Sequence, residues 1–168
     1  MTTIEVQLPT AEATRAFGAR LATVLRAGDL VVLTGELGAG KTTLTQGLGA
    51  GLGVRGQVAS PTFIIARVHP SISGGPPLVH VDAYRLASLD EVEALDLDAS
   101  LDESVTVVEW GAGLVESLAG DRLEVTIHRP RGAEGGAPFL DGAEAGVRRV
   151  TVTAVGERWA GVELPAAP

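Results

Sequence analysis

The order of apolar and polar residues along the chain follows two strand-like patterns. Alternation with a period of two predicts a β-strand, and a short continuous apolar run is typical of a strand that is buried on both faces. Together these patterns predict strands at residues 4–8, 30–34, 62–68, 78–82, 105–109, 122–128 and 147–155.

Helices are predicted where the apolar period lengthens and capping signals flank it. Pro9 and Thr10 open the first helix, which places apolar residues on one face and stops at Gly28. A second helix is expected at about residues 41–52, closed by Gly53, because glycine favours the position just after a helix. Ser88 begins a capping box for a short acidic helix that ends near residue 95.

Strands that alternate with helices indicate an α/β layer fold with a mostly parallel central sheet. The strands at residues 122–128 and 147–155 have no crossover helix between them, so they are expected to form an antiparallel extension. A chain of 168 residues suits one domain that spans residues 1–168. We expect its tail, residues 156–168, to be frayed.

Composition narrows the function classes. The chain has no cysteine, no apolar run of the roughly 18 residues that a membrane helix needs, and no secretory signal pattern at its start, so a cytoplasmic protein without membrane contact is expected. The net charge of −8 argues against direct strong nucleic-acid binding, which requires a basic surface.

The single lysine of the chain, Lys41, lies in a glycine-rich segment. Residues 35–42, Gly-Glu-Leu-Gly-Ala-Gly-Lys-Thr, match the phosphate-binding pattern G-x-x-x-x-G-K-[ST] between a predicted strand and a predicted helix. Backbone N–H groups in such a loop converge on phosphates, the lysine reaches the β- and γ-phosphates, and the hydroxyl of Thr42 ligates Mg²⁺. The expected phosphate-binding residues are Gly35, Glu36, Leu37, Gly38, Ala39, Gly40, Lys41, Thr42 and Thr43. The loop makes the expected fold a three-layer one like that of P-loop NTPases.

Two acids each end an apolar strand, Asp82 after residues 78–81 and Glu109 after residues 105–108. If both strands run parallel to the strand before the phosphate loop, the acids share one edge of the sheet with it. A P-loop enzyme needs one acid for Mg²⁺ and one group that positions the attacking water. The residues themselves leave open which acid has which role.

Further candidates lie near these motifs. Thr62, in Ser-Pro-Thr-Phe at residues 60–63, could sense a γ-phosphate as switch loops do. Arg85 could stabilise a transferred phosphate, and Trp110 follows Glu109 directly. The three histidines lack metal-ligand spacing, although His80 is expected on the same strand face as Asp82.

The segments GELGAGKTT, SPTF, HVDAYRL and VVEWG, in this order and spacing, resemble the TsaE (YjeE) family from about residue 8 to residue 155. The resemblance implies a bacterial P-loop ATPase, dependent on ATP and Mg²⁺, that is needed for threonylcarbamoyladenosine modification of tRNA. It implies that Mg²⁺ is held by Thr42 and Glu109, that Asp82 acts near the γ-phosphate, and that Trp110 matters for activity.

The resemblance also implies partners and a base site. ATP hydrolysis would act on a TsaB–TsaD complex, which itself transfers the threonylcarbamoyl group. The adenine would be contacted near residues 10–12, where Ala11 is the candidate. It would also be contacted near the last strand by Arg148 or Arg149, and Arg149 is the candidate there.

The same residues bear on other classes of nucleotide-binding protein. A Ras-type GTPase would read guanine with N-K-x-D, but the chain has no asparagine and its one lysine is in the loop, so this class is excluded. A small-molecule kinase would need an arginine-bearing lid, for which Arg129 and Arg131 are the candidates. The kinase and a non-hydrolysing, nucleotide-gated binding module stay open as alternatives.

Overall fold

The computed structural model describes residues 2–35, 40–54, 66–82, 101–109, 120–128 and 147–166. Within these ranges the elements are β1 (Thr2–Leu8), α1 (Ala11–Ala22), β2 (Leu30–Gly35), α2 (Lys41–Leu52), β3 (Ala66–His69), β4 (Leu78–Asp82), β5 (Val105–Glu109), β6 (Arg122–His128), β7 (Arg148–Val155) and the 3-10 helix η3 (Glu157–Trp159). The strand positions agree closely with those predicted; for the third predicted strand, residues 62–65 lie outside the described residues, as does the helix expected from Ser88.

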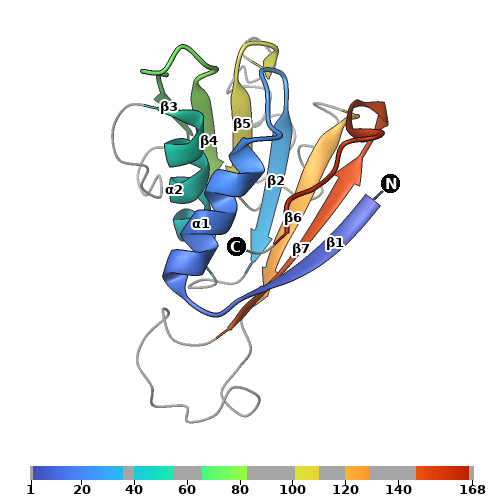
Figure 1. The fold of residues 1–168 in the computed structure, drawn as a ribbon. Coiled ribbons are helices and arrows are strands. Elements are labelled where there is room, and N and C mark those ends of the chain that lie inside the picture. Colours follow the sequence, from blue (N-terminus) through green and yellow to red (C-terminus); the bar gives the residue numbers. More distant parts are fainter. Residues whose placement is uncertain are drawn as a thin grey trace.

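The seven strands form one sheet in the order β1-β7-β6-β2-β5-β4-β3 (Figure 1). The four central strands β6, β2, β5 and β4 are parallel, and β3, β7 and β1 are antiparallel to their neighbours. This arrangement confirms the mostly parallel sheet and the antiparallel pairing of the last two strands. The pairing of β1 with β7 at the sheet edge was not predicted, because nothing local in either strand encodes its partner.

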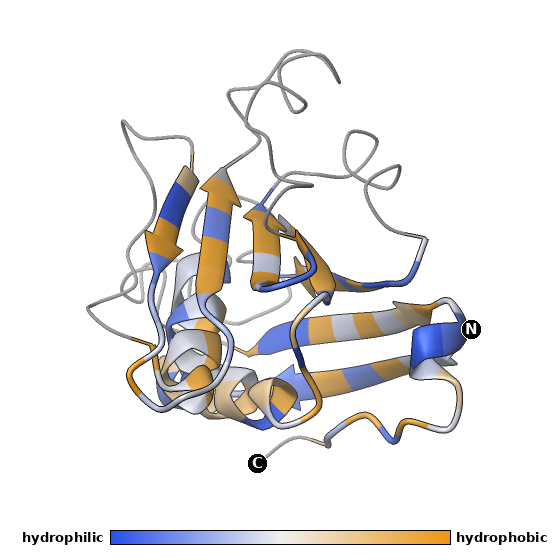
Figure 2. Ribbon diagram, turned by 90° about the horizontal axis from the view of Figure 1, so that it is seen from above, coloured by the Kyte–Doolittle hydropathy of each residue, from blue (hydrophilic) through white to orange (hydrophobic). Residues whose placement is uncertain are grey.

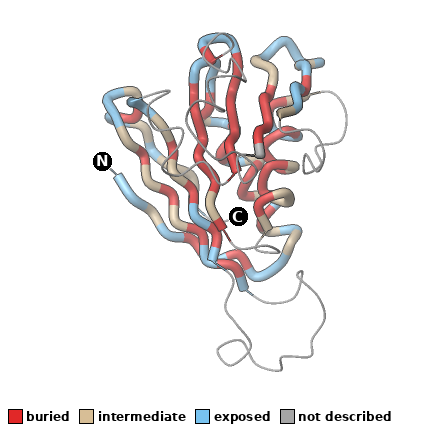
Figure 3. Tube along the Cα trace, turned by 180° about the vertical axis from the view of Figure 1, so that it is seen from behind, coloured by how far each residue is buried: buried red, intermediate tan, exposed pale blue. Residues whose placement is uncertain are grey.

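Helices α1 and α2 lie together on one face of the sheet (Figure 1). Their apolar residues form one core with one face of the strands, including Phe17, Leu48, Val31 and Val107. β2 and β5 are apolar along most of their length, whereas the strands beside the N-terminus show alternating bands (Figure 2). All five residues of β5 are buried, and the buried positions run through the middle of the sheet (Figure 3). Parallel strands buried on both faces explain this continuous apolar pattern.

The two helices approach each other closely at glycines. A Cβ atom at Gly47 of α2 would collide with the carbonyl oxygen of Arg15, and one at Gly18 of α1 would collide with that of Leu44. Only glycine permits this backbone separation. The contact fixes α2, and with it the first helical turn after the glycine-rich segment, against α1 and the sheet.

Helix α1 ends earlier than expected. It was predicted to reach Gly28, but its last residue is Ala22, and the N–H and hydroxyl of Thr23 both donate to the carbonyl of Arg20. Gly28 instead occupies a turn with φ of 98° before β2. The apolar residues after Ala22, such as Leu25, remain buried without being helical, which explains why periodicity alone extended the helix.

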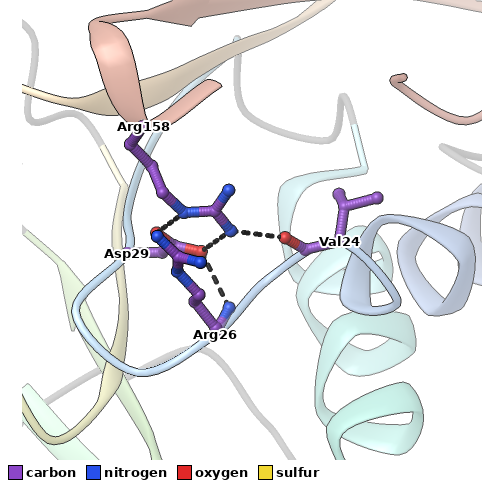
Figure 4. A network of polar contacts seen from close by, with 4 residues as sticks. All are labelled: Val24, Arg26, Asp29 and Arg158. Atoms are coloured by element: carbon purple, nitrogen blue, oxygen red, sulfur yellow. Dashed lines mark hydrogen bonds and ion pairs between the residues drawn. The ribbon is translucent and has the colours of Figure 1, made fainter. Parts of the chain in front are cut away.

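The tail expected to be frayed is ordered over residues 156–166, where η3 places Trp159 in the core with 3% exposure. Arg158 donates from Nε to Asp29 Oδ1 at 3.0 Å, and from Nη2 to Asp29 Oδ2 at 2.9 Å and to the carbonyl of Val24 at 2.8 Å (Figure 4). The backbone N–H of Arg26 also donates to Asp29 Oδ2 at 2.7 Å. This Asp29–Arg158 clamp joins the tail to the turn before β2 and explains why the tail is ordered and not frayed.

Candidate functional site

The glycine-rich segment connects β2 to α2. β2 ends at Gly35 and α2 begins at Lys41, with residues 36–39 outside the described part of the chain. Gly40 has φ of 112° and ψ of 15°, a left-handed conformation that L side chains rarely adopt. Its carbonyl accepts the N–H of Leu44 at 2.9 Å, so the first turn of α2 starts directly after it. The first N–H groups of a helix lack partners within the helix, so this turn offers donors to an anion.

Lys41 is buried at this turn, with 5% exposure. Its Nζ donates to the carbonyl of Gly35 at 2.7 Å, which brings the ammonium across the connection to the end of β2. Thr45 anchors the turn by donating from its hydroxyl to the carbonyl of Lys41 at 2.8 Å. Thr42 and Thr43 occupy the same turn and are half-buried. The single lysine side chain of this protein is thus held at the start of α2.

The two acids expected at strand ends lie on adjacent strands. β4 pairs in parallel with β5, and Asp82 is the register partner of Glu109. β5 also pairs in parallel with β2, where Glu109 is level with Leu33. Both acids therefore sit at the carboxyl edge of the parallel strands, the edge from which the connection to Lys41 leaves, as the sequence predicted.

Glu109 has a partner that sequence reasoning missed. His80 Nε2 lies 2.5 Å from Glu109 Oε2, and the two side chains have 0% and 5% exposure. The sequence placed His80 on the face of Asp82 but gave no sign of a bond to an acid 29 residues away. The usable signal is that His80 precedes the end of β4 by two residues, so a parallel neighbour of matching register brings Glu109 within reach.

Magnesium fits the oxygen donors at this edge better than a metal that needs a full protein cage. Among the described residues no group of three His, Cys, Asp or Glu side chains is arranged to hold a metal ion. Mg²⁺ is commonly bound through one or two protein oxygens, with waters and substrate phosphates completing the shell. The hydroxyl of Thr42 and the carboxylate of Glu109 are donors of this kind.

Of the candidate base-contact residues, Arg148 lies beside the glycine-rich segment. Thr10 caps α1, accepting the N–H of Ala13 at 3.0 Å, and Ala11 is the first residue of that helix. A Cβ atom at Gly40 would lie 3.8 Å from Thr14 Cγ2 and 4.0 Å from Arg148 Nε. Arg148 is buried with 5% exposure, whereas Arg149 is exposed. Of the two arginines considered, the structure brings Arg148 to the loop.

Several predicted site residues lie outside the described residues, and their roles stay predictions. They are Glu36, Leu37, Gly38, Ala39, Thr62, Arg85, Trp110, Arg129 and Arg131. The remaining histidines are not gathered around His80 as a metal site. His69 is buried on edge strand β3, and His128 is exposed at the end of β6. No helix in the described ranges has the length and apolar character needed to cross a membrane.

The described residues define an α/β protein in which a glycine-rich strand-to-helix connection, a buried lysine and two strand-end acids share one edge of a parallel sheet. The family model of the Threonylcarbamoyl adenosine biosynthesis protein TsaE matches residues 8–134. A tRNA threonylcarbamoyladenosine biosynthesis protein TsaE from Streptomyces coelicolor is 64% identical over 151 residues, which cover 89% of this chain and 96% of the relative. The protein of the same name from Bacillus subtilis is 38% identical over 149 residues, which cover 88% and 84%.

The crystal structure of Bacillus subtilis YdiB is similar, with a TM-score of 0.69 and 32% identity, covering 95% of this chain and 90% of that one. The chain belongs to the TsaE family, whose role is in the biosynthesis of threonylcarbamoyladenosine in tRNA.

Proposed function

We propose that this chain is a Mg²⁺-dependent ATPase that supports threonylcarbamoyladenosine modification of tRNA by acting on a TsaB–TsaD-like transferase complex. The observation that carries the proposal is the position of Lys41. Its buried ammonium group lies in the first turn of α2 and reaches back to the Gly35 carbonyl, so it spans the segment that would enclose phosphates. A compact ammonium suits a β- or γ-phosphate there, and the helix N-terminus adds its positive end.

The chain's own groups divide the work of binding and hydrolysis. Backbone N–H groups of residues 35–43 would hold the phosphates, and Lys41 would exchange the Gly35 carbonyl for phosphate oxygens. Thr42 and Glu109 would hold Mg²⁺, which when bound neutralises charge on the phosphates. Asp82, level with Glu109 on the adjacent strand, would orient the attacking water or sense the γ-phosphate. Thr62 and Trp110 are proposed to act at the same site.

The base would lie beyond the start of α2, near Ala11 and the first residues of β7. Arg148 supports this position because its Nε lies beside Gly40, and Arg149 remains the second candidate. The absence of asparagine excludes an N-K-x-D motif, so GTP is not expected to be preferred over ATP. With a net charge of −8, the isolated chain is expected to bind tRNA weakly, so contact with the modification machinery would run through protein partners.

The Lys41→Ala variant tests the nucleotide site. Calorimetry should show ATP affinity lowered about 100-fold or more, equivalent to ~2.7 kcal/mol, with an unchanged thermal melting profile. Lys41→Arg is the matched control: it keeps the charge, but its planar guanidinium does not fit a site shaped for an ammonium, so it should not restore binding. Equal ATP affinity in parent and Lys41→Ala would refute the nucleotide assignment. Phosphate release from ATP, with and without TsaB–TsaD-like proteins, then separates an ATPase from a non-hydrolysing module.

A further inference from the structure

The pair formed by His80 and Glu109 joins two central strands beneath the proposed nucleotide site. His80 lies on β4 and is fully buried, and Glu109 is the last residue of β5. In the parallel register His80 is level with Val107, and Asp82 is level with Glu109. The hydrogen bond between His80 and Glu109 is therefore diagonal: it joins Glu109 to a residue two positions before its register partner on β4. It fixes the position of one carboxylate oxygen of Glu109.

The chemistry of the pair assigns the donor. An ionised carboxylate only accepts hydrogen bonds, so the proton between His80 Nε2 and Glu109 Oε2 is carried by Nε2. His80 Nδ1 is buried and has no partner among the described residues. In the described part of the chain, Oε2 of Glu109 accepts a hydrogen bond and Oε1 accepts none. Oε1 therefore remains available to a ligand.

Packing alone does not explain this pair. The neighbouring positions on the same face of the sheet, Leu78, Val105 and Val107, are apolar and buried, and an apolar side chain of similar volume would fill the place of His80 among them. Replacing a buried polar pair by apolar residues is often neutral or stabilising. Carboxylates that ligate metals are, in contrast, commonly held by a hydrogen bond from a second residue, whose loss costs about 10–100-fold in metal affinity or activity.

We propose that His80 is a positioning residue that acts through Glu109: Nε2–H holds Oε2, so that Oε1 is presented to a divalent cation or to water bound to it. This inference rests on the proposed function, in which Glu109 serves Mg²⁺. In this arrangement His80 would touch neither the nucleotide nor the metal.

Two substitutions of His80 separate positioning from packing. His80→Gln carries its amide nitrogen about as far from the backbone as Nε2, so it can still donate to Glu109. His80→Asn ends at the distance of Nδ1 and leaves Oε2 without a donor. The probe is Mn²⁺, measured by electron paramagnetic resonance on protein saturated with a non-hydrolysable ATP analogue, with nucleotide binding in chelator as the metal-free reference.

The Asn variant should lose about 10–100-fold in Mn²⁺ affinity, whereas the Gln variant should stay within about threefold of the parent. In the absence of metal, the nucleotide affinity of both variants should stay within about threefold of the parent's. Equal Mn²⁺ affinities in parent, Gln and Asn proteins, with lower melting temperatures in both variants, would show that the pair serves packing alone and would overturn the inference.

A measurement on the parent chain keeps the test decisive if the Asn variant fails to fold. Nitrogen-15 chemical shifts of the His80 ring should show a proton on Nε2, and a ring protonated on Nδ1 alone would overturn the inference. A parent chain that binds no nucleotide would overturn the proposed function together with this inference. A parent that binds nucleotide and Mn²⁺, but whose Asn variant matches it, refutes the role of His80 alone.

Discussion

At the amino edge of the parallel strands Asp29 precedes β2, and at their carboxyl edge Glu109 ends β5. Both acids are 4% exposed, and each faces a nitrogen donor from a distant part of the chain. Asp29 accepts three hydrogen bonds over both oxygens, from Arg158 and from the backbone of Arg26 (Figure 4). Glu109 accepts one, on Oε2, from the described residues.

This difference fits a structural role for Asp29 and the metal-binding role proposed for Glu109. Both oxygens of Asp29 accept hydrogen bonds from residues that hold the fold together, which is typical of a structural carboxylate. A buried carboxylate with an oxygen to spare, at the edge where a helix begins, is suited to receive a cation. The comparison therefore predicts that changes at the Asp29–Arg158 clamp alter stability, whereas changes at Glu109 alter metal and nucleotide binding.

The largest expected effect is that of Arg158→Ala. Removing the guanidinium leaves Asp29 charged and buried, so the free energy of unfolding should fall by about 3–5 kcal/mol in urea denaturation. ATP hydrolysis well below the melting temperature should be unchanged. The control is Arg122→Ala, which removes an ion pair with the more exposed Glu124 and should cost less than about 1 kcal/mol. A loss in Arg158→Ala no greater than in this control would contradict a structural role for the clamp.

An intermediate effect is expected at the carboxyl edge. Glu109→Ala should weaken Mg·ATP binding about tenfold or more, which is ~1.4 kcal/mol. It should destabilise the fold less than Arg158→Ala, because in the described residues Glu109 makes one hydrogen bond and Arg158 makes three. Asp82→Ala should keep Mg·ATP affinity and lose single-turnover hydrolysis, because it removes an interaction made mainly in the transition state.

Calorimetry and single-turnover assays of both variants decide these roles, with Glu124→Ala on β6 as the acidic control. Reversed phenotypes would mean that Asp82 serves the metal and Glu109 the water. Full activity in both would mean that neither strand end faces the nucleotide.

The smallest expected effect concerns communication between the edges. In a double-mutant cycle of Arg158→Lys and Glu109→Ala, the two changes in the free energy of unfolding should add to within about 0.5 kcal/mol, because among the described residues the two share no hydrogen-bond partner. Urea denaturation of the four proteins measures this term. A coupling energy above about 1 kcal/mol would show that β2 and β5 transmit strain between the two edges. The separate roles of Asp29 and Glu109 would then be refuted.

Local sequence determined most elements and the positions of the main candidate residues. Alternation and apolar runs located the strands, Gly53 ended α2, and the glycine-rich segment put Lys41 at a helix start. These features depend on neighbours within a few residues, which is the range over which periodicity and capping act. The shared edge of Asp82 and Glu109 also followed, because parallel strands align their carboxyl ends.

Tertiary structure alone decided which distant residues meet. The His80–Glu109 bond spans 29 residues and depends on β4 lying beside β5 in one register, and the Arg158–Asp29 bond spans 129 residues. Arg158 also donates to the carbonyl of Val24, two residues beyond the end of α1 at Ala22, so the tail is held against the segment that follows α1. Strand order and register are set by the packing of whole faces, which no short stretch of sequence specifies. For that reason the sequence predicted a phosphate-binding segment around Lys41 but not the hydrogen bond between His80 and Glu109.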